Sequence, residues 1–327
     1  MIFKEFDRGS LKILPLSDRK NKMTVADIHN LDYWPLYNES DLDRLVLKIA
    51  KARENNKEVI LMMGAHAIRR GNSRFIIDLI NRGIITHVAT NGAAAIHDFE
   101  LALIGATAEN VEDYIKEGEF GNWEETGRYI NKAINNGYKA GLGYGESIGQ
   151  MIEESWVGCE VIKFPHKDTS VFAAAYRKNI PITVHKLIGA DITDQHPEAR
   201  YSALGWCSGR DFLIFSNTIS KLEGGVFLNI GSAVTGPEIY LKALSMARNK
   251  AKQEGKEIKN FTTAVFDIIN LDRLYRKDDA FSPEYYFRPK KTILIRTVAE
   301  GGKSFYIKGD LGITIPNLYQ KMIIIMK

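Results

Sequence analysis

With 327 residues, 45% of them hydrophobic, the chain can bury a large core, and its net charge of +4 is interspersed rather than gathered into a nucleic-acid-binding stripe. No apolar run approaches the ~20 residues that a membrane-spanning helix needs, and the N-terminus shows no signal-peptide pattern. Two cysteines, Cys159 and Cys207, make neither a disulfide framework nor a zinc-ligand spacing, so we expect a cytoplasmic protein that uses no metal and binds neither nucleic acid nor membrane.

The first 40 or so residues are polar and irregular, and we interpret them as an N-terminal arm. An aromatic patch at 33–37 is expected to dock either on the body of the same chain or on a neighbouring subunit. Ser40 is a suitable N-cap for a helix predicted over 41–55, because Leu42, Leu45, Val46 and Ile49 recur on one helical face.

Two successive strand-loop-helix units follow over 59–105. The apolar run 59–63 predicts a strand closed by Gly64, and the spacing of Phe75, Ile76, Leu79 and Ile80 predicts a helix after it. A second strand is predicted over 84–89, and Asn91-Gly92 opens a turn into a helix over 97–104. This alternation is typical of a parallel sheet, so we expect an α/β fold with a Rossmann-like parallel sheet flanked by helices, as one large domain over 1–327.

The two loops leave the carboxyl ends of their strands, where open α/β sheets bind ligands. The first loop offers Gly64, His66, Arg69 and Arg70, a set suited to an anionic group such as a phosphate. The second offers a backbone without bulky side chains from Gly92 onward, followed by polar residues that include His97 and Asp98. The alternative is that Arg69 and Arg70 are a solvated pair and that His97 is a helix-cap residue.

The rest of the chain continues the alternation of helices and strands. Helices are predicted over 110–117, 124–136, from about 146, 169–178, 211–222, 239–252 and after Pro316, and strands over 179–184, 225–230, 262–269, 291–296 and 304–307. The glycine-rich run at 141–145 lacks a preceding strand, so we expect a flexible linker or lid there. Gly231-Ser232 follows a strand and could present backbone amides to a phosphate.

A third loop follows the strand at 179–184 and holds His185, Asp191, Asp194 and His196 within a dozen residues. This cluster is compatible with a divalent-metal site, with a pocket for a cation, or with an ordinary capping turn.

An ordered series of motifs resembles the deoxyhypusine synthase family over roughly residues 55–320. The matching blocks are Asp98-Phe99-Glu100-Leu101, Gly118-Glu119-Phe120, Asn179-Ile180-Pro181-Ile182 and Gly224-Gly225-Val226-Phe227-Leu228. A fifth block, Pro283-Glu284 with Lys291-Thr292-Ile293, resembles the segment of the family that carries its active-site lysine.

The resemblance implies an NAD-dependent transfer of the aminobutyl arm of the polyamine spermidine, through an imine on a lysine, in a homotetramer. It implies Lys291 as the catalytic lysine, with Lys290 as a rival, and it implies Asp194, Asp191 and Glu284 as substrate ligands. A solvated charge pair at a strand start is the alternative for the two lysines. The residues implied or suited for NAD are Gly64, His66, Arg69, Asn91, Gly92, His97, Asp98, Gly231 and Ser232.

The sequence also departs from the family pattern at several of these positions. Pro289 replaces the tryptophan that stacks on the polyamine, Gly236-Pro237 replaces a pair of histidines, and Ala65-His66 replaces a Ser-Asn cofactor loop. Arg69 stands where the family has a small polar residue. The competing hypotheses are therefore a different enzyme on this fold that binds an anionic ligand, and a non-catalytic nucleotide-binding protein.

Overall fold

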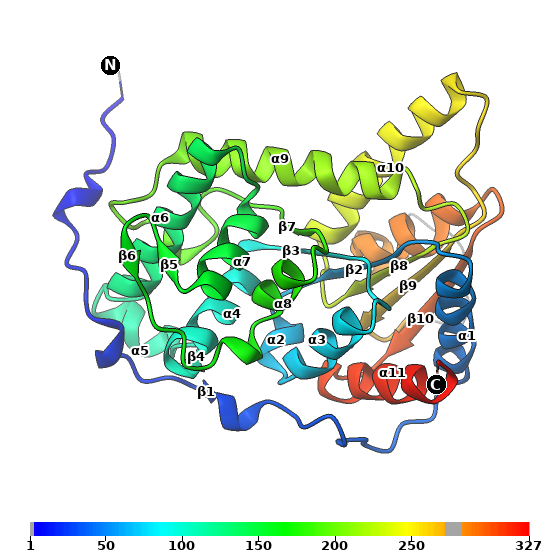
Figure 1. The fold of residues 1–327 in the computed structure, drawn as a ribbon, viewed down its shortest axis with the longest axis horizontal. Helices are drawn as coiled ribbons and strands as arrows, with labels where there is room; N and C mark the ends of the chain where they lie inside the picture. Colours follow the sequence, from blue (N-terminus) through cyan, green and yellow to red (C-terminus); the bar gives the residue numbers. More distant parts are fainter. Residues whose placement is uncertain (1–2, 272–282, 327) are drawn as a thin grey trace.

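The computed structural model describes residues 3–271 and 283–326, and its centre is a sheet of six parallel strands (Figure 1). The strands are β2 (Val59–Met63), β3 (His87–Thr90), β7 (Ile182–Val184), β8 (Val226–Ile230), β9 (Thr262–Asp267) and β10 (Lys303–Lys308). Their order in the sheet is β10-β9-β8-β2-β3-β7. The chain therefore starts in the centre, winds out to β7, returns to β8 beside β2 and winds out to β10, which is the strand order of the Rossmann fold. The predicted α/β fold class is confirmed.

Helices cover both faces of the sheet (Figure 1). One face carries α1 (Ser40–Glu54), α2 (His66–Arg69), α3 (Ser73–Asn81), α4 (Gly92–Ile104), α8 (Val171–Arg177) and α11 (Leu311–Ile325). The other carries α9 (Tyr201–Ile219), α10 (Thr235–Gln253) and the short turns η7 (Lys290–Ile295) and η8 (Arg296–Val298).

Alternate residues of the central strands enter two separate cores, because side chains of a strand point to opposite faces. In β2, Val59, Leu61 and Met63 pack on the side of α1, α3 and α11, whereas Ile60 and Met62 pack on the side of α9 and α10. Burial on both faces explains why these strands are continuous apolar runs in the sequence.

The connection from β3 to β7 carries an additional layer of helices and one short antiparallel ribbon. It contains α5 (Val111–Lys116), α6 (Glu124–Ala140), α7 (Tyr144–Glu154) and the pair β5 (Trp156–Val157) and β6 (Glu160–Val161). The small antiparallel pair of β1 (Met23–Thr24) and β4 (Ala106–Thr107) joins the arm to this layer.

The N-terminal arm runs over the surface of its own chain (Figure 1). The Trp34 indole donates to the Asn317 side chain at 2.9 Å, and the Tyr37 hydroxyl donates to the Lys308 carbonyl oxygen at 2.7 Å. Of the two expectations for the aromatic patch, docking on the same chain is therefore the one observed.

The glycine-rich run at 141–145 is a close-packed turn between α6 and α7, so the expectation of a flexible linker or lid is wrong. Gly141 ends α6 in the left-handed conformation, with φ of 75°. A Cβ atom on Gly143 would overlap the Asp211 carboxylate, and one on Gly145 would overlap the Ile182 carbonyl oxygen. Glycine is favoured at 141 by the positive φ, and it is needed at 143 and 145 because neighbouring groups occupy the space of a side chain.

Within residues 3–271 and 283–326, no helix combines the length and the apolarity needed to cross a membrane. Predicted boundaries are mostly close to those observed, but α9 begins at Tyr201, ten residues before the predicted start at 211. Its first turns contain Gly205 and Gly209, which weaken the helical signal in the sequence.

Candidate functional site

The two central strands, β2 and β8, end side by side, and the chain leaves them toward opposite halves of the sheet. Their backbones touch there: the Gly64 N–H donates to the Ile230 carbonyl oxygen at 2.9 Å, and a Cβ atom on Gly64 would overlap the Gly231 carbonyl oxygen. The Ser232 hydroxyl accepts from the N–H of Gly236 at 2.9 Å, at the start of α10. Gly64, Gly231 and Ser232 are thus brought together at the switch point, the place where open α/β sheets bind ligands.

The two arginines of the first loop have different roles. The Arg70 guanidinium forms an ion pair with Asp310, the N-cap of α11, at 2.9 Å. Arg69 is exposed, and no ion pair or side-chain hydrogen bond engages it within the described part of the chain. Partial burial and the charges of both arginines lower the pKa of neighbouring His66. Arg69 is therefore available to a ligand, whereas Arg70 is committed to the fold.

The start of α4 forms the second loop of the site. The Asn91 side chain caps the helix by accepting a backbone N–H of the first turn, and a Cβ atom on Gly92 would overlap the Asp191 carboxylate. The Nδ1 atom of His97 lies 2.8 Å from the Thr107 hydroxyl. Burial lowers the pKa of His97 to about 4, so the ring is neutral near pH 7.

Asp98, predicted to bind the cofactor, faces another element of the fold. Its carboxylate accepts from the Val171 N–H at 2.7 Å and from the Ser170 hydroxyl, both at the start of α8. Burial raises its pKa to about 7. Asp98 therefore ties α4 to α8 and is not among the residues that line the pocket described next.

A pocket of about 230 Å³ lies beside the carboxyl ends of β2, β3 and β7. Its walls come from α2, α4, the third loop and the N-terminal arm. The charged or titratable residues that line it are Arg19, Arg69, His97, Glu100, Glu109 and Asp191. Two of the predicted cofactor residues, Arg69 and His97, therefore share one cavity.

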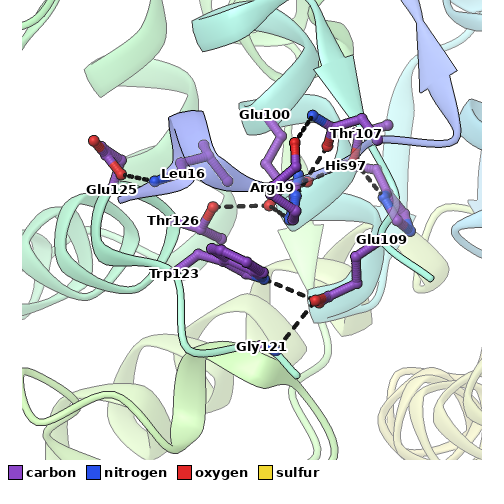
Figure 2. Close-up of polar contacts among 11 residues, drawn as sticks. Leu16, Arg19, His97, Glu100, Thr107, Glu109, Gly121, Trp123, Glu125 and Thr126 are labelled. Atoms are coloured by element: carbon purple, nitrogen blue, oxygen red, sulfur yellow. Dashed lines mark hydrogen bonds and ion pairs between the residues drawn. The ribbon is translucent and has the colours of Figure 1, made fainter. Parts of the chain in front are cut away.

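The arm contributes one wall through a buried ion pair (Figure 2). The Arg19 guanidinium donates to both oxygens of Glu100 at 2.8 and 2.7 Å, and each side chain is 1% exposed. Thr107 and Thr126 donate their hydroxyls to the same carboxylate at 2.6 and 2.7 Å. Burial alone would raise the pKa of Glu100, but these donors, Arg19 above all, hold it below its usual value. The charge of Arg19 is thus already paired with the Glu100 carboxylate.

The third loop contains a lysine that the sequence analysis missed. The Lys186 ammonium is buried between Asp194, at 2.7 Å, and Asp191. Asp194 also accepts from the Gly189 N–H at 2.7 Å. The two carboxylates predicted to hold a substrate ammonium therefore already hold one from the chain itself. The available signal was that Lys186 stands two residues after the end of a buried strand at the ligand-binding edge.

The histidines of this loop do not join the aspartates. His185 is buried against the ring of Phe215, and burial lowers its pKa to about 3. His196 lies 3.5 Å from Glu124 on α6. Among the residues that the structure describes, no group of three or more His, Cys, Asp and Glu side chains could hold a metal ion.

The segment 291–296, predicted as a strand, forms the π-helical turn η7 and the start of η8, so this prediction is wrong. Parallel strands β9 and β10 are neighbours, which forces the intervening chain to cross over a face of the sheet. The carbonyl oxygens of Ile293 and Leu294 accept from Thr263 and Ser304, each the second residue of its strand. The backbone of Lys291 is thereby placed near the amino ends of β9 and β10 rather than at the carboxyl edge.

Lys291, the predicted catalytic lysine, is also far from the third loop. The Lys291 ammonium lies 3.8 Å from the centre of the Tyr285 ring, and the Glu284 carboxylate lies 3.7 Å from the ammonium of the neighbouring Lys290. Four strand spacings separate β9 from β7, or about 19 Å. Within one chain, Lys291 and Glu284 therefore do not share a small-molecule site with the two aspartates of the third loop.

No protein-family model matches the sequence, and no curated protein matches it. Solved structures share the fold. The C264A mutant of AgrE bound to L-arginine gives a TM-score of 0.51 at 14% identity, over 90% of this chain and 34% of AgrE. The chain thus spans about a third of the length of AgrE, another structure of which contains ornithine and NAD+.

Two further structures resemble the chain more weakly. A conserved LOR/SDH protein from Methanococcus maripaludis S2 gives a TM-score of 0.49 at 15% identity, over 90% of this chain and 72% of that protein. A protein from Entamoeba histolytica described as a deoxyhypusine synthase gives a TM-score of 0.41 at 11% identity, over 88% of both chains. At these identities the likeness extends to the fold.

Proposed function

We propose that the chain is an enzyme that uses a nicotinamide dinucleotide, bound across the crevice between the ends of β2 and β8. The observation that carries this proposal is the contact between Gly64 and Gly231 at the switch point, where bare backbone can approach a pyrophosphate closely. The 19-residue helix α10 starts just after Ser232, and the amino end of a helix favours an anion. NAD+ is the first probe to use, since a structure of AgrE contains it.

The residues at the switch point divide between the two parts of such a ligand. The adenosine half of a dinucleotide lies over the first half of a Rossmann sheet, here β2, β3 and β7, where Arg69, Asn91 and His97 stand. Gly64 and Ser232 flank the position of the pyrophosphate. The bound cofactor supplies hydride transfer, while the protein supplies position and a partly buried surround.

Adding a negative charge at the crevice tests this proposal. Ala233 is exposed in the loop between β8 and α10, and A233D should weaken NAD+ binding about tenfold, because two charges ~6 Å apart at an effective dielectric of ~40 repel by about 1.4 kcal/mol. The matched control is A299D, at an exposed alanine in the crossover just before β10. Calorimetry that finds the same affinity in both variants would place the dinucleotide elsewhere.

A second candidate function is the deoxyhypusine synthase type of reaction, an aminobutyl transfer from spermidine through an imine on Lys291. The order of the motifs supports it, as does the burial of Lys291, 6% exposed, beside Tyr285, since imine chemistry needs a lysine shielded from water. Borohydride treatment with spermidine and NAD+ should then leave an adduct that mass spectrometry finds on Lys291, and K291A should lose it while K290A keeps it. An NAD+-binding protein without any adduct would retain the first proposal and eliminate the second.

A further inference from the structure

We infer that the adenosine end of this site takes a ribose 2′-phosphate, so that the ligand is NADP(H) rather than NAD(H), and that Arg69 is the residue that selects it. The inference rests on the dinucleotide site proposed above. It concerns the pocket of about 230 Å³ beside β2, β3 and β7, which Arg69 and His97 both line.

The residues at the end of the second Rossmann strand support this choice. In this fold an acidic residue near that point binds the 2′-hydroxyl of NAD, whereas a nearby arginine accommodates the 2′-phosphate of NADP. Here the second strand, β3, ends at Thr90 and is followed by Asn91, and neither is acidic. The carboxylate that does reach this point, Asp191 against Gly92, is held by the buried ammonium of Lys186.

Arg69 is the cation that this arrangement leaves for a ligand. It lines the same pocket as His97 and Asp191, it is exposed, and nothing in the described part of the chain pairs with it. Its neighbour Arg70 is already bound to Asp310. A guanidinium can bind a phosphate through two parallel hydrogen bonds, which gives it both affinity and orientation for that group.

Each acidic residue that lines the pocket has a bonding partner other than Arg69. Glu100 is neutralised by Arg19, at 2.8 and 2.7 Å. Glu109 is turned toward the Trp123 indole, at 2.8 Å, and the N–H of Gly121, at 3.4 Å, as Figure 2 shows. The carboxylates of the pocket wall thus have partners other than Arg69, and among the described residues nothing pairs with its guanidinium.

Calorimetry with NAD+, NADP+ and the fragments 5′-ADP and 2′,5′-ADP tests the inference, because each pair differs only in the 2′-phosphate. We expect NADP+ to bind about 10- to 100-fold more tightly than NAD+, the range of a charge-assisted hydrogen bond. R69A should remove most of the preference for NADP+, because it should weaken the binding of NADP+ far more than the binding of NAD+. R70A is the matched control and should keep the full preference, and circular dichroism melts should show that both variants fold.

The outcomes separate this inference from the proposal beneath it. If NAD+ binds as tightly as NADP+, the 2′-phosphate assignment is overturned and the dinucleotide site stands. The same holds if R69A weakens both ligands equally, since Arg69 would then contact the pyrophosphate that they share. If neither dinucleotide binds to the wild-type chain, both proposals are wrong.

Discussion

Replacing Arg19 with alanine tests how the arm is fastened to the wall of the candidate site. Arg19 and Glu100 form a two-fold hydrogen-bonded pair, and each side chain is 1% exposed. Removing one partner of a buried pair leaves an uncompensated charge and costs about 3–5 kcal/mol. Thr107 and Thr126 still donate to the carboxylate in R19A, so we expect the lower end of that range, about 3 kcal/mol.

Urea unfolding followed by circular dichroism would measure this loss in R19A, E100Q and the double variant R19A/E100Q. E100Q removes the buried charge, so the double variant should lose less stability than the sum of the single variants, with a coupling of about 2 kcal/mol. Because the pKa of Glu100 is lowered in the folded protein, its contribution is present above the unfolded pKa and is lost as the pH falls. The difference between wild type and R19A should therefore shrink in acid.

The matched control for this experiment is R44A. Arg44 pairs with Asp41 at 2.8 Å on the surface, where the two side chains are 62% and 24% exposed, and such pairs contribute less than about 1 kcal/mol. If R19A loses no more stability than R44A, the reasoning that burial makes the arm contact strong is refuted.

Three further predictions concern stability and assembly. His87 lies buried 2.8 Å from the Thr218 hydroxyl, and burial lowers its pKa to about 3. The unfolded state therefore takes up the proton first, and the free energy of unfolding falls as the pH drops from 6.5 toward 3. H87Q should reduce the slope of the unfolding free energy against pH by up to about 1.4 kcal/mol per pH unit, and an unchanged slope would contradict this assignment. G145A should lower the free energy of unfolding in urea by about 2 kcal/mol, because its Cβ atom would overlap the Ile182 carbonyl oxygen. The control G205A should not destabilise the protein, because a Cβ atom at this exposed helix position would have no heavy atom within 4 Å. Equal stabilities of the two variants would show that the turn at Gly145 can relax. We also expect a homotetramer, and light scattering that shows a monomer at micromolar concentration would exclude it.

Much of the fold follows from local patterns in the sequence. The apolar runs of β2 and β8 and the helical spacing of Phe75, Ile76, Leu79 and Ile80 depend on neighbours a few residues away, so they predict the first βα unit and the parallel sheet. The ligand-binding edge follows in turn, because all loops after parallel strands emerge on the same side. The short apolar run around Ile293 is the exception, since a run of that length fits a strand or a helical turn equally well, and the crossover between β9 and β10 decided in favour of the turn.

Tertiary structure decided which polar side chains have a partner within the protein. Arg69 and Arg70 are adjacent and chemically identical in the sequence, yet Asp310, 240 residues beyond Arg70, binds only one of them. Asp98 likewise looks like a ligand of the pocket until the start of α8 takes its carboxylate. An ion pair or a helix cap needs partners within about 4 Å, and only the return of distant segments to the same place in the fold sets which groups those partners are. The sequence alone therefore determined which edge of the sheet can bind a ligand, and the folded chain determined that Arg69, of the two arginines, has no partner among the described residues.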